Sequence, residues 1–60
     1  MSYKTVTIEA NADPKKHAEN AATVTNACNQ LARDGFRVIA ITPQTFGGHL
    51  FGVLITGEKA

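Results

Sequence analysis

The residues able to do acid–base or nucleophilic chemistry in this chain are one cysteine, two histidines and five carboxylates. A nucleophilic cysteine needs a neighbouring base. His17 lies about 16 Å from Cys28 if both belong to one helix, at about 1.5 Å per residue. Ser2, the single serine, lies at the amino terminus, and no motif pairs the carboxylates. The sequence therefore predicts no catalytic residues, no metal and no cofactor, and a packing role for Cys28.

A small cationic cluster, Lys15, Lys16 and His17, falls where a helix is expected to begin. Acidic residues are normally preferred at that end of a helix, because the helix dipole is positive there. An anion held jointly by the lysine side chains and the free helix N–H groups would explain the exception. The alternative is a pair of solvated lysines in a flexible loop, and both interpretations stay open at this point.

A second candidate ligand site is the glycine pair Gly47 and Gly48, followed by His49. Glycine lets backbone N–H groups approach an anion closely, and an adjacent imidazole can assist. The same two glycines are also typical of an ordinary hairpin turn. No Gly-Lys-Ser or Gly-Lys-Thr follows them, so the pattern differs from the phosphate-binding loop of nucleotide hydrolases.

Three segments have the composition of strands. Residues 3–9 alternate between apolar and polar side chains, and residues 36–42 and 50–56 are apolar on both faces. Pro43 is expected to end the second strand, and a glycine-bearing loop over residues 45–49 is expected to join it to the third. The last two strands therefore form a predicted hairpin.

One helix is expected over residues 18–34, where apolar residues recur at steps of three and four. Asp13 and Pro14 are a suitable N-cap and first helical residue, and Gly35 is a typical left-handed stop. The apolar stripe is made mostly of small side chains, so the helix can lie close to a sheet but brings little volume. Its members are Ala21, Val24, Thr25, Cys28, Leu31 and Ala32.

These elements predict an α+β fold, with a single βαββ domain over residues 1–60. A right-handed crossover makes the first two strands parallel and places the helix on one face of the sheet. The third strand is the most apolar and is expected between the other two, in a three-stranded antiparallel or mixed sheet of order 1-3-2. Gly52 in that strand indicates a bulge or a close approach of another group to the backbone.

The two apolar strands imply cover on both faces of the sheet, but one helix can cover only one face. Sixty residues are also near the lower limit for an independently stable domain. A disulfide within the chain is excluded, because Cys28 is the single cysteine. We therefore expect a homo-oligomer that buries the second face, with an interface made of Ile39, Ile41, Phe51, Val53 and Ile55.

Three features of the sequence recur in a known group of proteins. They are the opening strand Tyr3-Lys4-Thr5-Val6, the helix exit with Leu31, Gly35, Phe36 and Val38, and the apolar last strand with a basic end over residues 47–59. In these features the chain resembles short bacterial and phage βαββ sequences grouped as a domain of unknown function, number four-one-seven-seven. It departs from them in having Phe36 in place of the usual tryptophan and a helix poorer in leucine. The resemblance implies the fold and brings no catalytic residues and no agreed activity.

The charge balance restricts the partners that the chain can have. Six basic and five acidic residues give a net charge of +1, whereas nucleic-acid binding requires a basic excess. No apolar run is long enough to span a bilayer, and residues 1–9 lack the layout of a secretion signal. A single cysteine is typical of a reducing compartment. The sequence therefore predicts a cytoplasmic protein with neither a membrane nor a nucleic-acid partner.

From these features we expect a non-enzymatic oligomeric binding module. Its ligand would be a small anion or a nucleotide, held between subunits by residues 15–17 and 47–49. A phage protein that sequesters nucleotide immune signals is a specific form of this hypothesis. The alternative is a protein-interaction adaptor that uses an exposed sheet edge or apolar face. An inter-subunit enzyme site built from His49 and Glu58 has no support in the sequence.

Overall fold

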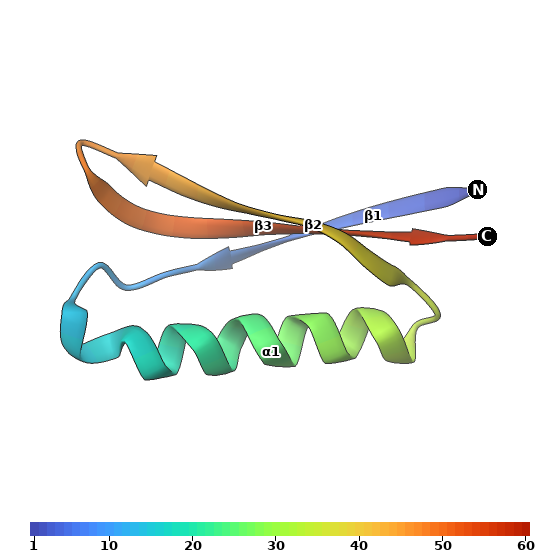
Figure 1. The fold of residues 1–60 in the computed structure, drawn as a ribbon, viewed down its shortest axis with the longest axis horizontal. Helices are drawn as coiled ribbons and strands as arrows, with labels where there is room; N and C mark the ends of the chain where they lie inside the picture. Colours follow the sequence, from blue (N-terminus) through green and yellow to red (C-terminus); the bar gives the residue numbers. More distant parts are fainter.

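The computed structural model describes all residues from Met1 to Ala60 and has one helix packed on one face of a three-stranded sheet (Figure 1). The elements are β1 (Ser2–Glu9), the short 3-10 helix η1 (Pro14–Lys16), α1 (His17–Arg33), β2 (Arg37–Phe46) and β3 (His49–Lys59). Strand β3 lies between β1 and β2 and is antiparallel to both. The predicted α+β fold, its βαββ arrangement and the strand order 1-3-2 are confirmed.

Both ends of the helical segment form for local reasons. The Asp13 carboxylate caps η1 by accepting a hydrogen bond from the Lys15 backbone N–H at 3.0 Å. At the other end Gly35 has a φ of 88°, and the Phe36 N–H donates to the Leu31 carbonyl at 2.9 Å. This is the Schellman arrangement, in which a left-handed glycine lets the chain turn back on the last helical turn.

The core lies between α1 and the central strand. Only Leu31, Val53 and Ile55 are buried large apolar residues. Seven partly buried apolar side chains pack around them: Val6, Ile8, Val24, Ala27, Cys28, Phe36 and Val38. The packing role predicted for Cys28 is therefore confirmed, but the predicted stripe is too wide. Ala21, Thr25 and Ala32 are exposed, because the contact face of α1 is centred on Val24, Cys28 and Leu31.

The hairpin is tighter, and its strands longer, than the sequence predicted. Pro43 does not end β2 but lies inside it, opposite Val53. Proline lacks a backbone N–H and is tolerated in a sheet at an edge strand, and β2 is one. The turn consists of Gly47 and Gly48 alone, with φ values of 59° and 81°. Two successive residues with positive φ are typical of the two-residue turn that matches the twist of a hairpin.

Two register shifts in the pairing of β2 with β3 change which side chains share a face. One leaves Ile39 without a partner between Val38 and Ala40, and the other leaves Phe51 without one. A residue added to one strand of a pair breaks the alternation of side chains. Because of the first bulge, Ile41 lies opposite Ile55 and so shares the inner face, which we define as the face toward α1.

The interface predicted from the sequence is wrong for Val53 and Ile55. Both are buried under α1 within a single chain. Alternate residues of a strand lie on the same face of the sheet, and for Val53 and Ile55 this is the face that α1 covers. Ile39, Ile41 and Phe51 are exposed, and their part in an interface stays a prediction.

The outer face, which points away from α1, is mostly polar. The hydroxyls of Thr5 and Thr56 are 2.9 Å apart, and Arg37 forms an ion pair with Glu58 across the sheet. Among the β3 residues that pair with both neighbouring strands, Leu54 is the one large apolar residue that faces this side, and it is half-buried. The buried apolar side chains of the sheet are therefore those on the inner face, under α1.

Candidate functional site

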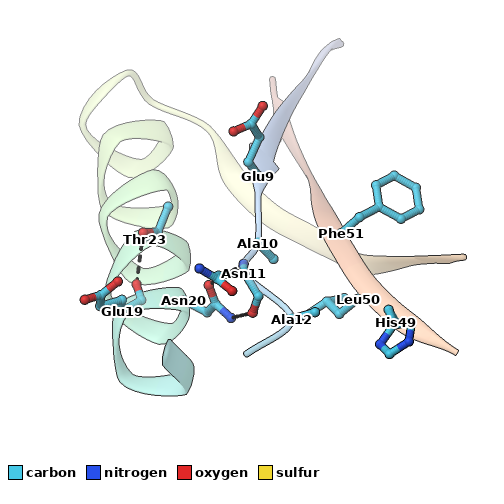
Figure 2. Close-up of a pocket in the computed structure, with 10 residues that line it drawn as sticks. All are labelled: Glu9, Ala10, Asn11, Ala12, Glu19, Asn20, Thr23, His49, Leu50 and Phe51. Carbon is cyan, nitrogen blue, oxygen red and sulfur yellow. Dashed lines mark hydrogen bonds between the residues drawn. The ribbon is translucent and has the colours of Figure 1, made fainter. Parts of the chain in front are cut away.

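The largest open groove of the molecule has a volume of about 560 Å³ and lies at the end of the sheet that carries the hairpin turn (Figure 2). Three segments meet there: the end of β1 with the loop that follows it, the first turns of α1, and the start of β3. The lining residues are Glu9, Ala10, Asn11, Ala12, Glu19, Asn20, Thr23, His49, Leu50 and Phe51.

Two asparagines hold the loop against the helix. The Asn20 side chain accepts a hydrogen bond from the Asn11 backbone N–H at 3.0 Å and donates one to the Asn11 carbonyl at 2.8 Å. The Asn11 side chain in turn accepts from the Asp13 N–H at 2.9 Å. Because these amides satisfy loop backbone that no strand reaches, they have a structural role. This contact could not be predicted from the sequence, since the two residues belong to different elements.

Of the other polar side chains in the groove, some form hydrogen bonds or ion pairs within the chain and some form none. The Thr23 hydroxyl donates to the Glu19 carbonyl at 2.9 Å, and the Glu19 carboxylate lies 3.3 Å from the Lys16 ammonium. Glu9 and His49 have no side-chain partner within the chain. The groove thus offers one free carboxylate and one free imidazole, and its two carboxylates make it unfavourable for an anion.

The cationic cluster predicted as an anion site lies at the helix start but outside this groove. The anion that its residues contact is supplied by the chain itself. Asp13 accepts the Lys15 N–H, and Glu19 pairs with Lys16. The ion pair with Glu19 accounts for Lys16 at the positive end of the helix without a bound ligand. Lys15 and His17 are exposed and free of ion pairs.

The predicted glycine site is part of a different surface. Gly47 and Gly48 form the turn and have open space around them, while His49 lines a second hollow of about 370 Å³ with Phe46 and Phe51. The two phenylalanines are 83% and 54% exposed. Figure 2 shows the Phe51 ring directed away from α1. Phe46 was missed by sequence reasoning, because it was assigned to the loop.

No three side chains among His, Cys, Asp and Glu lie close enough to hold a metal ion. In the structure no helix combines the length and the apolar character needed to cross a membrane.

The fold and the groove together define a small βαββ domain with two uncovered sheet edges. Comparison with family models, curated proteins and solved structures finds no match to this chain. The resemblance to the family of unknown function therefore stays a prediction.

Proposed function

We propose that this protein is a non-enzymatic binding module that works as a homo-oligomer. The observation that supports this proposal is the size of the core. Five of the 60 residues are buried, and three of these are the whole apolar core. Domains of this size are marginally stable unless a partner adds to the buried surface. Six large apolar side chains are exposed in the single chain: Met1, Tyr3, Ile39, Ile41, Phe46 and Phe51.

A binding role is favoured over a catalytic one by the condition of the polar groups in the groove. Asn11, Asn20 and Thr23 are engaged in hydrogen bonds that hold the loop and the helix. The remaining imidazole and carboxylate, on His49 and Glu9, are exposed. Neither has a side-chain partner that would hold it in one position, whereas general acid–base catalysis needs a positioned side chain.

Sedimentation velocity and native mass spectrometry at micromolar concentration test the proposal. We expect a discrete oligomer and a thermal midpoint that rises with protein concentration, because association stabilises the folded state by mass action. A folded monomer whose midpoint is independent of concentration would refute the proposal.

A second candidate concerns the ligand. We propose that the assembled protein binds a small anionic ligand, and a nucleotide in particular, at the hairpin end. The segment of Lys15 and the hairpin turn lie at the same end of the molecule (Figure 1). The exposed rings of Phe46 and Phe51 offer a surface on which a base can stack. The lysines at this same end of the chain would then contact the phosphates. Sequestration of a nucleotide signal is one use of such a site.

Calorimetric titration with mononucleotides and cyclic dinucleotides tests this ligand class. Phe51→Ala and Lys15→Glu should each abolish binding, whereas Arg33→Glu, the same charge change at the other end of α1, should leave it intact. Absence of heat with every nucleotide would remove the ligand proposal. Recovery of one stoichiometric protein partner in a pull-down, lost on mutation of Ile39 or Phe51, would support the adaptor alternative instead.

A further inference from the structure

We infer that strand β1 pairs with β1 of a second copy, in antiparallel orientation around a two-fold axis. The two three-stranded sheets then form one continuous sheet with both helices on the same face. This inference rests on the proposed homo-oligomer, and it identifies the surface through which the oligomer forms.

The orientation of the β1 backbone can be read from two contacts with β3. The Ala10 N–H donates to the Phe51 carbonyl at 3.0 Å, and a Cβ placed on Gly52 would meet the Ile8 carbonyl oxygen at 3.0 Å. The even-numbered residues of β1 therefore direct their backbone groups toward β3. Backbone groups alternate in direction along a strand. The residues that direct N–H and C=O groups to the open edge are Tyr3, Thr5, Thr7 and Glu9.

The opposite edge of the sheet is protected against the same kind of pairing. The alternation along β3 places the backbone groups of Thr42 and Gln44 toward β3, so Ile41 and Pro43 point outward. Pro43 has no N–H to donate, and the bulge at Ile39 disrupts the edge on the other side of Ile41. Proline and bulges are the usual features that prevent edge pairing. One open edge and one protected edge give a closed dimer rather than a fibre.

Strand β1 has neither protection. It contains no proline, and it pairs with β3 without a bulge over its whole length. A charged residue directed inward can also protect an edge, and Lys4 is such a residue. Its ammonium lies 3.7 Å from the Asp34 carboxylate of its own chain. This ion pair can persist when a second strand pairs with the β1 edge, so Lys4 does not prevent that pairing.

One register of the two β1 strands uses every free backbone group. It places Val6 opposite Val6 of the second copy, Thr5 opposite Thr7, and Tyr3 opposite Glu9. The opposed side chains are then two valines, two threonines, Tyr3 with Glu9, and Lys4 with Ile8, with no pair of like charges. If the register between the two β1 strands shifts by two residues, the outward backbone N–H and C=O groups of Tyr3 or Glu9 lose their partners. Unpaired backbone groups at an interface are unfavourable.

A cysteine scan tests this register directly. In a Cys28→Ala background, Val6→Cys should form a disulfide-linked dimer on mild oxidation, because directly opposed residues on the symmetry axis lie within disulfide reach. Thr5→Cys and Thr7→Cys alone should cross-link at least about tenfold more slowly, since neither faces its own copy. A mixture of these two variants should cross-link readily, because Thr5 faces Thr7.

A proline substitution tests the same edge without cysteine chemistry. Thr7→Pro removes an outward N–H while leaving the ladder to β3 in place, and should weaken the dimer at least about tenfold. Thr7→Val keeps the N–H and the side-chain shape, and should leave the dimer unchanged. Circular dichroism reports whether Thr7→Pro is folded. If that variant is unfolded, the cross-linking of Val6→Cys alone tests whether the β1 strands pair.

The outcomes separate this inference from the proposed function. A wild-type protein that is a folded monomer overturns both. A wild-type oligomer that Thr7→Pro leaves intact, together with no preferential cross-linking of Val6→Cys, overturns the β1 pairing and leaves assembly through another surface.

Discussion

The neighbouring residues Ile41 and Ile55 provide a test of how much the cover of α1 contributes to stability. They lie opposite each other on β2 and β3 and share the inner face, yet Ile55 is 0% exposed and Ile41 is 51% exposed. Truncation of either to alanine removes the same atoms and a similar strand preference. The difference between the two losses in the free energy of unfolding therefore measures how much the packing of α1 over the sheet contributes to stability.

The expected magnitudes follow from the two exposures. An isoleucine-to-alanine change removes three carbon atoms, worth about 0.8 kcal/mol each when fully buried, or about 2.4 kcal/mol in total. At Ile55 a cavity is added, so we expect a loss of about 2–5 kcal/mol in the free energy of unfolding. Ile41 is about half exposed, so its truncation loses roughly half of the burial free energy, about 1.2 kcal/mol. No cavity term is added there, because water fills the space left by the removed atoms.

The assay is urea unfolding followed by circular dichroism. A domain of this length has a stability of about 3–9 kcal/mol, from about 0.05–0.15 kcal/mol per residue, so Ile55→Ala is close to the limit of folding. The valine variants provide a milder pair, with a loss of about 0.5–1.5 kcal/mol at Ile55 and less than half of that at Ile41. If assembly uses β1, Ile41 stays exposed in the dimer and its loss does not change with protein concentration.

Equal losses at the two positions, measured where the chain is monomeric, would refute the assignment of Ile55 to the core and Ile41 to an uncovered surface. A loss at Ile41 that grows with concentration would instead show that a partner covers β2, contrary to the inferred dimer.

Three further predictions test other parts of the structure. Gly57→Ala should cost about 1–3 kcal/mol in a thermal melt, because the added Cβ would lie 2.9 Å from the Phe36 Cβ; an unchanged midpoint would contradict the close packing. Pro43→Thr restores an N–H on the β2 edge and should produce larger assemblies in light scattering, so a size equal to wild type would show that proline is not what protects this edge. Asn20→Ala removes two hydrogen bonds to Asn11, worth about 1–3 kcal/mol together, and should accelerate amide exchange at Asn11 in NMR; unchanged exchange would mean that the loop is held otherwise.

The sequence by itself determined the elements and their order. The alternation over residues 3–9 and the helical period ending at Gly35 are local patterns that need no knowledge of the rest of the chain. The strand order 1-3-2 followed from the handedness of the crossover and the apolar third strand, and the structure has that order. These predictions succeeded because each depends on a property of neighbouring residues or on a general rule of chain topology.

Only the tertiary structure decided which side chains share a face or a groove. The bulge at Ile39 reassigns Ile41 to the inner face, and the register shift at Phe51 places Phe46 opposite His49 and beside Phe51. The groove joins residues that are far apart in the sequence, such as Glu9 and His49. A strand with apolar residues at nearly every position does not specify which residue is left unpaired. That choice is made when β2 and β3 align under α1, where the position of one unpaired residue determines the face of every side chain beyond it.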